Sequence, residues 1–172
     1  ETDALRAFEA APGLSGAVDL LAEIYTRQSR LPQARKSFEE AEAAGVLHPG
    51  GRLLLARLRE LSGDAAGARA LLESLLAERP NMHAAMSELA RLLADQGGES
   101  GRAEQLAVGA ASARRSSRAA AHAAGYVYLR SGRFAEALVE LERARELPEA
   151  LGRNADAELH YHLGLTLGGL TR

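Results

Sequence analysis

The chain has 172 residues, a formal net charge of −2 and no Cys. It is long enough to bury a hydrophobic core. It contains 36 Ala and 29 Leu, both strong helix formers, but only one Ile, five Val and 4% aromatic residues. Because β-branched and aromatic side chains are the ones that suit a pleated sheet, this composition predicts an all-α protein.

Several classes of protein are disfavoured at once. A net charge near zero argues against binding nucleic acid through bulk charge. The absence of Cys excludes disulfides and Cys-based zinc sites. No apolar run approaches about 20 residues, so we expect no membrane span. We expect no signal peptide in these residues, because no basic region is followed by an apolar run at the N-terminus. The composition suits the cytoplasm and the periplasm equally, and the localisation stays unknown. The Ala and Arg excess suggests a bacterial source.

The most informative pattern is a repeat of 34 or 35 residues. Small residues recur at this spacing at Ala22, Ala56, Ala90 and Gly125, and again 39 residues later at Gly164. A second set of small residues follows the first at Ala34, Ala68, Ala103 and Ala137. A bulky residue lies four positions after these at Phe38, Leu72 and Leu141, with the smaller Ala107 in the third unit. Small residues at fixed points of successive helices allow their backbones to approach closely.

This pattern resembles the tetratricopeptide repeat (TPR) family, in a bacterial-type array, whose unit is a 34-residue helix–turn–helix. The resemblance implies a right-handed superhelical α-solenoid. Turn residues fall between the expected helices, and Pro32 lies just inside a helix start, where its missing N–H costs nothing. Three glycines and a one-residue insertion between Gly97 and Gly101 predict a longer, looser loop there.

We expect one TPR array over 1–172. Its units are a half repeat at 1–14, four repeats at about 15–48, 49–82, 83–117 and 118–156, and a half repeat at 157–172. The expected helices cover 3–11, 15–28, 32–44, 50–61, 65–78, 82–95, 101–113, 118–130, 134–146 and 155–168. Leu159, Leu163 and Leu167 have no following helix to cover them. We therefore expect either a fragment of a longer array or a possible homo-oligomer formed through uncapped terminal helices.

The resemblance implies a concave groove lined by the first helix of each unit, where TPR ligands usually lie. We take five residue offsets in each unit as groove positions. They give a candidate ligand-binding groove of Asp19, Glu23, Arg27, Arg57, Glu60, Ser87, Arg91, His122, Tyr126, Arg130 and Tyr161. The same offsets also include Leu53, Asp95, Glu158 and Leu165.

Two kinds of side chain in this set suit recognition. Arg57, Arg91 and Arg130 predict a basic row that would bind carboxylates or phosphates. Tyr126 and Tyr161 are amphipathic residues of a type common in binding hot spots. The alternative is that these are ordinary solvated helix positions. A clamp for a peptide C-terminal carboxylate, as in chaperone-binding TPR domains, is disfavoured because Asp19 and Glu23 occupy its positions in the first unit.

Other candidate sites have simpler explanations. Glu158 and His162 share a helix face, but His160 points elsewhere, so we expect no metal site and a partly packed helix instead. The glycine-rich segments lack the Gly-Lys-Ser/Thr of a phosphate loop. Arg114, Arg115 and Arg118 form a basic turn that is either solvated or contacts an acidic partner or RNA. No catalytic arrangement stands out, and we expect neither a cofactor nor enzymatic activity.

The leading hypothesis is a non-catalytic protein–protein interaction scaffold that binds a peptide or protein segment in the concave groove. The second is a structural or self-association segment of a larger bacterial envelope assembly, of the polysaccharide-export or pilus type. The third is a regulatory region attached to an enzyme. The partner's identity does not follow from the sequence, since a fold does not specify a function.

Overall fold

The computed structural model describes residues 21–148, except 23, and residues 154–171. Backbone contacts divide the chain into two compact units, 1–82 and 83–172, which are described separately below as unit 1 and unit 2. All regular structure in the described residues is helical, which confirms the all-α prediction.

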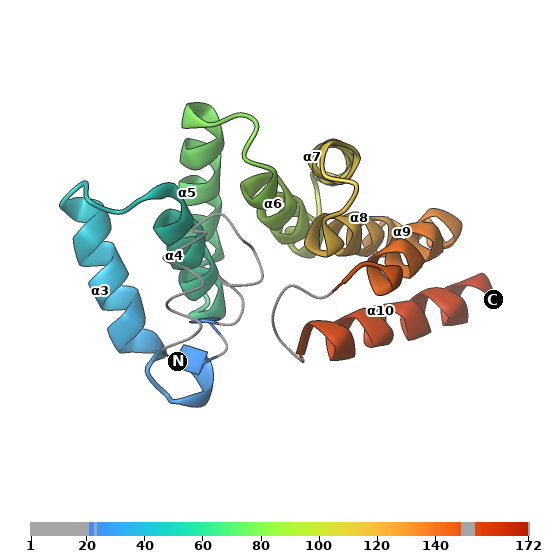
Figure 1. Cartoon of the computed structure of the whole chain (residues 1–172), viewed down its shortest axis with the longest axis horizontal. Coiled ribbons are helices and arrows are strands. Elements are labelled where there is room, and N and C mark those ends of the chain that lie inside the picture. Colours follow the sequence, from blue (N-terminus) through green and yellow to red (C-terminus); the bar gives the residue numbers. More distant parts are fainter. Residues whose placement is uncertain (1–20, 23, 149–153, 172) are drawn as a thin grey trace. The chain divides into compact units, whose positions relative to one another are not determined.

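The described part of unit 1 contains three complete helices and helical residues at 21–22 and 24–27. The complete helices are α3 (Leu31–Ala43), α4 (Pro49–Leu61) and α5 (Ala65–Glu78) (Figure 1). α3 packs on α4 and α4 packs on α5. The side chains of His48 and Asp64 accept hydrogen bonds from the first turns of α4 and α5, and Pro32 lies in the first turn of α3.

Unit 2 consists of helical hairpins followed by a longer helix. Its helices are α6 (His83–Gln96), α7 (Ser100–Ala113), α8 (Arg118–Arg130), α9 (Phe134–Glu146) and α10 (Asn154–Leu170) (Figure 1). Each helix from α6 to α9 packs on the next, and α10 packs on α9. In addition, α6 contacts α8 and α8 contacts α10, so the alternate helices α6, α8 and α10 form one layer.

The predicted helix limits agree with the described ones to within two residues from α3 onward. The expected helix 3–11 lies outside the described residues, and the expected helix 15–28 lies partly outside them. In the described residues no helix is long and apolar enough to cross a membrane.

The repeated small residues are buried, as their spacing predicts. Ala56 and Ala90 are almost inaccessible in the first helices of their repeats, as are Ala68, Ala103 and Ala137 in the second helices. Gly125 shows why the position must be small. A Cβ there would lie 2.6 Å from Cγ of Leu141 and 3.1 Å from its backbone nitrogen, so α8 and α9 cross too closely to admit a methyl group.

The turn between α6 and α7 differs from the expectation of a longer, looser loop. It has three residues, 97–99, like the turns at 62–64 and 131–133. The inserted residue is taken up by α6, which has 14 residues where α4 and α8 have 13. That expectation was wrong because the glycines provide the positive φ that the turn requires and do not lengthen the loop. Gly63, Gly98 and Gly132, the middle residues of the three turns, all have positive φ.

The C-terminal helix is less uncovered than its sequence indicates. Leu159 and Leu163 are buried in a core cluster with Ala121, Leu141 and Ala144 of α8 and α9. The expectation that these two leucines lack cover was therefore wrong, because the preceding hairpin covers them. Leu167 is half exposed, as are Leu165 and Leu170. α10 thus has one face buried against unit 2 and another open to solvent.

Candidate functional site: the face of α6, α8 and α10

The groove positions predicted in unit 1 differ in exposure where the structure describes them. Asp19 and Glu23 lie outside the described residues, and Arg27 is exposed on the helical stretch before α3. Nη1 of Arg57 donates a hydrogen bond of 2.9 Å to Glu60, one turn later on α4. Leu53 is completely buried, so placing it in an open groove was wrong. It is a core residue of α4.

In unit 2 the structure brings several predicted groove residues together around one carboxylate. Asp95, near the end of α6, accepts a hydrogen bond from the hydroxyl of Tyr126 on α8. Asp95 also accepts from Nη1 of Arg130 and from Nη1 of Arg91, each at 3.4 Å. Arg91 donates in addition to Glu88 at 3.2 Å. We call these five residues the Asp95 cluster.

The cluster corrects the prediction of a basic row. Arg57, Arg91 and Arg130 each have a carboxylate partner: Glu60 for the first, Glu88 and Asp95 for the second, and Asp95 for the third. The positive charges are therefore largely compensated where they arise. The prediction of a basic row was wrong because acidic side chains pair with the guanidinium groups. These acidic residues lie one turn away on the same helix or on the first helix of the adjacent repeat.

Hydrogen bonding in the cluster makes Tyr126 a poor acid. Burial and the hydrogen bond to Asp95 raise the pKa of the Tyr126 hydroxyl to about 12. The hydroxyl stays protonated at physiological pH, so it can both donate to Asp95 and accept from Nη1 of Arg130 at 3.3 Å. The guanidinium carbon of Arg130 also lies 6.0 Å from the centre of the Tyr126 ring. These contacts restrict both side chains before any ligand binds.

A pair of histidines continues the same face toward α10. Nε2 of His122 lies 2.9 Å from Nδ1 of His162, across the boundary between α8 and α10. The His162 ring also packs against the rings of Tyr126 and Tyr161, with centroids 4.6 and 5.8 Å apart. Ser87 is buried on α6 and therefore contributes little open surface.

Burial changes the acid–base properties of both histidines. Desolvation, with the charges of His162, Arg118 and Arg91, lowers the pKa of His122 to about 3. Desolvation also lowers the pKa of His162, against the opposing effect of Glu158 and Asp95. Both rings are therefore neutral near pH 7, and one donates to the other. In the described residues, no group of three His, Asp or Glu side chains is arranged to hold a metal ion.

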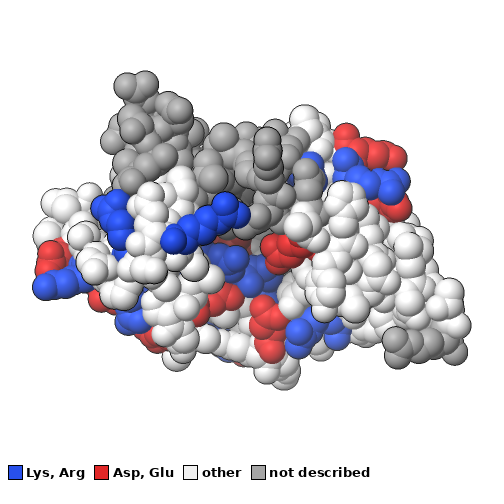
Figure 2. Space-filling model, turned by 90° about the horizontal axis from the view of Figure 1, so that it is seen from below, with Lys and Arg blue, Asp and Glu red and all other residues white. Residues whose placement is uncertain are grey.

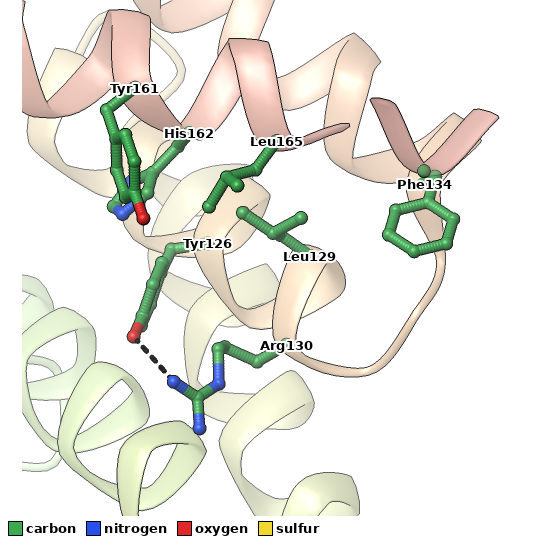
Figure 3. A pocket seen from close by; sticks show the side chains of 8 residues that line it. Tyr126, Leu129, Arg130, Phe134, Tyr161, His162 and Leu165 are labelled. Atoms are coloured by element: carbon green, nitrogen blue, oxygen red, sulfur yellow. Dashed lines mark hydrogen bonds between the residues drawn. The ribbon is translucent and has the colours of Figure 1, made fainter. Parts of the chain in front are cut away.

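Next to the Asp95 cluster is a pocket between α8, the start of α9 and α10. It has a volume of about 480 Å³ and shares Tyr126 and Arg130 with the cluster. The other lining residues are Leu129, Phe134, Tyr161, His162, Leu165 and Gly169. In Figure 3, Leu129 and Leu165 point toward each other from facing helices, and Arg130 stands at the lower edge beside the Tyr126 hydroxyl.

Charge on the rest of the surface is mixed. Figure 2 shows basic and acidic side chains interspersed on the face that it draws. The basic turn after α7 has Arg114 and Arg115 exposed, and Ser117 in the same turn caps the first turn of α8 through a hydrogen bond from Ala120. This turn therefore has a structural role in starting α8.

Sequence reasoning missed part of the site. His162 was expected only as a partly packed residue, and its burial confirms the packing but not the contact with His122. The sequence did contain a signal for this contact. The 39-residue spacing that aligns Gly164 with Gly125 also aligns His162 with Ala123, and Ala123 is buried. A histidine at such a packing position needs a hydrogen-bond partner. Leu129 and Phe134 carried no comparable signal.

Comparison with known proteins identifies the fold. No protein-family model and no curated protein matches the chain. Among solved structures, a tetratricopeptide repeat protein from Parabacteroides merdae ATCC 43184 is 20% identical, with a TM-score of 0.62 over 97% of this chain and 66% of that one. MamA from Desulfovibrio magneticus RS-1 is 15% identical, with a TM-score of 0.60 over 88% and 82% of the two chains.

A third similar structure is YrrB, described as a TPR protein with an unusual peptide-binding site. It is 17% identical to this chain, with a TM-score of 0.59 over 98% of this chain and 80% of that one. Together these similarities confirm the fold expected from the 34-residue spacing. The chain has the TPR-type helical repeat fold.

Proposed function

We propose that the chain is a non-catalytic protein-interaction scaffold, and that α6, α8 and α10 of unit 2 present its binding surface for a peptide or protein segment. The observation that carries this proposal is the Asp95 cluster. Side chains from two helices, which belong to different repeats, are held together by one carboxylate beside an aromatic pocket.

Preorganisation is the physical advantage of this arrangement. Tyr126, Arg130 and Arg91 already have defined positions, so a ligand that contacts them needs to immobilise fewer free rotamers. Tyr and Arg are also the residue types that most often dominate binding energy at protein interfaces. The peptide-binding site named for YrrB lends general support, since the two proteins share a fold.

The proposal is tested by capture from lysate of a bacterium that encodes the chain. The bait is the parent protein beside a Tyr161→Ala/Arg130→Ala double variant. Both altered side chains are substantially exposed, so we expect the helical circular dichroism spectrum to be preserved. A partner of this face should be retained by the parent and reduced at least tenfold on the double variant.

The matched control is a His160→Ala/Arg102→Ala double variant. Both residues are exposed in unit 2 and neither lines the pocket. It should retain the same proteins as the parent. Equal retention by all three baits, or retention of no protein at all, would contradict the proposed binding face.

A second candidate function is self-association, in line with a structural role in a larger assembly. The exposed side chains of Tyr161, Leu167 and Leu170 on α10 favour it. Sedimentation velocity at increasing protein concentration tests it. A concentration-dependent dimer that Leu167→Ser abolishes would support self-association, whereas a monomer at every concentration would contradict it.

A further inference from the structure

The pocket between α8 and α10 has apolar walls that are open to solvent. Tyr161 and Leu165 are both exposed, although they lie beside the buried residues His162 and Thr166 on α10. Leu129 and Phe134 complete the walls from α8 and α9. A volume of about 480 Å³ lies within the range of pockets that hold ligands, about 300–1,000 Å³. Binding of an apolar side chain in this pocket is favourable because it removes the exposed apolar area of both partners from water.

The most exposed charged group at the edge of this pocket is the guanidinium of Arg130, which is also paired with Asp95. Among the Asp95 cluster residues, Arg130 has the most exposed side chain, at 47%, whereas Asp95 is 35% exposed. Within the described residues, both hydrogen bonds of Arg130 leave from Nη1. A guanidinium carries five N–H donors, so Nη2 and Nε retain the capacity to bind a carboxylate.

The negative charge nearby is already engaged. Asp95 accepts hydrogen bonds from Tyr126, Arg91 and Arg130, so a cationic ligand would have to compete with three existing donors. Glu88 is bound to Arg91 and only 17% exposed. The group that an incoming ligand meets first at the pocket edge is therefore the Arg130 guanidinium.

We infer that this pocket recognises a short acidic–apolar motif in the bound segment: an aromatic or branched aliphatic side chain next to Asp or Glu. The apolar side chain enters between Tyr161, Leu165 and Leu129. The neighbouring carboxylate pairs with Arg130. This inference rests on the proposed function, because it specifies which protein segment the face of α6, α8 and α10 selects.

Four fluorescein-labelled mixtures of nonapeptides test the motif by fluorescence anisotropy. The flanking positions of each peptide are a random choice of Ser, Gly or Ala. The four mixtures differ in their central pair, which is Phe-Glu, Phe-Gln, Phe-Lys or Ala-Glu. Each mixture contains both orders of its pair. We expect Phe-Glu to bind most tightly. Loss of the carboxylate should weaken binding about 3- to 10-fold, as expected for a partly exposed ion pair. Loss of the ring should weaken it at least 10-fold.

Variants then assign the effect to the pocket. Arg130→Gln should remove the preference for Phe-Glu over Phe-Gln, whereas Leu165→Ala should reduce the preference for Phe over Ala. The controls are matched in exposure. Arg102, on α7, is 44% exposed against 47% for Arg130, and Leu167 is 50% exposed against 46% for Leu165. Arg102→Gln and Leu167→Ala should leave both preferences unchanged.

The outcomes separate this inference from the proposed function. If captured proteins depend on the face but the mixtures bind equally, or Phe-Lys binds best, the motif is overturned and the binding face stands. The motif is likewise overturned if none of the mixtures binds at millimolar concentration, or if Arg130→Gln leaves the Glu preference intact. Failure of both the capture and the peptide experiments overturns the proposed function itself.

Discussion

Nε2 of His122 and Nδ1 of His162 are 2.9 Å apart, and this hydrogen bond joins α8 to the C-terminal helix α10. The arrangement suits one proton between two neutral rings. Protonation of one ring would place a positive charge in the buried pair, and protonation of both rings would remove the acceptor and place two positive charges side by side. The charged groups around the pair are Arg91, Glu88 and Asp95 of α6, Arg118 of α8 and Glu158 of α10. Their opposing signs largely offset one another, so burial dominates.

We predict that unit 2 loses stability as the pH falls below about 6.5. Burial lowers the folded-state pKa of His122 to about 3, below the unfolded value of 6.5, so the unfolded chain binds more protons between these values. The stability associated with neutral His122 is complete above pH 6.5 and decreases by at most about 1.4 kcal/mol per pH unit below it. Urea unfolding at pH 7.5, 6.5, 5.5 and 4.5 measures the slope.

His122→Gln should reduce this slope, because a glutamine amide can still donate to His162 but does not titrate. The control is His160→Gln on α10, which changes an exposed histidine and should leave the slope unaltered. A parent protein whose unfolding free energy rises on acidification would contradict the prediction.

Two glycines at equivalent repeat positions should respond oppositely to alanine. A Cβ at Gly125 would lie 2.6 and 2.8 Å from Cγ and Cδ2 of Leu141, whereas a Cβ at Gly164 meets nothing within 4 Å. We expect Gly125→Ala to destabilise unit 2 by about 1–3 kcal/mol through overpacking. Gly164→Ala should instead stabilise it by about 0.5–1 kcal/mol through helix propensity. Chemical denaturation of both variants checks this, and equal shifts would argue against the close crossing of α8 and α9.

The turn before α3 contains a residue that glycine should improve. Ser29 has a φ of 54°, at the repeat position where Gly63, Gly98 and Gly132 also have positive φ. Because a side chain raises the energy of this backbone conformation by about 1–2 kcal/mol, Ser29→Gly should raise the unfolding free energy of unit 1 by about 1 kcal/mol. The reverse test is Gly132→Ala in unit 2. Its Cβ meets nothing within 4 Å, so its cost of about 1 kcal/mol would be conformational alone. Thermal unfolding measures the effect of both substitutions. A destabilised Ser29→Gly variant would contradict the conclusion that the side chain at this position strains the turn.

Adjacent glycines near the end of α10 provide a test of the pocket wall. A Cβ at Gly169 would lie 2.5 and 2.6 Å from Cδ1 and Cζ of Phe134, whereas one at Gly168 meets nothing within 4 Å. Gly169→Ala should displace the Phe134 ring and increase amide hydrogen exchange in residues 163–170. Gly168→Ala should leave exchange unchanged or slow it slightly, since alanine favours the helix. Identical exchange in the two variants would mean that Phe134 does not hold this end of α10.

Much of the architecture could be predicted from the sequence. Spacing of small residues locates the helix pairs because only Ala or Gly fits where two backbones cross, as Gly125 shows against Leu141. The predicted helix limits were accurate because turn residues occur at the same points of each repeat. The turn at 97–99 was misjudged, since composition indicates that glycines are needed but not how many residues the turn takes.

The candidate site could be predicted only in part. Helical register alone placed Tyr126, Arg130 and Tyr161 on first helices, because their offsets repeat with the units. It did not reveal that Asp95 would accept hydrogen bonds from two other groove residues on α8, 31 and 35 residues later in the chain. Nor did it reveal that acidic neighbours would compensate the expected basic row.

The sequence by itself determined the helices, their pairing and the buried small positions, because these depend on local propensity and on a spacing repeated in every unit. Only the tertiary structure decided which polar side chains meet. The pairs Asp95–Tyr126 and His122–His162 depend on how α6, α8 and α10 lie against one another. Hydrogen bonds require atoms within about 3 Å, and that precision is set by the packing of whole helices rather than by residue type.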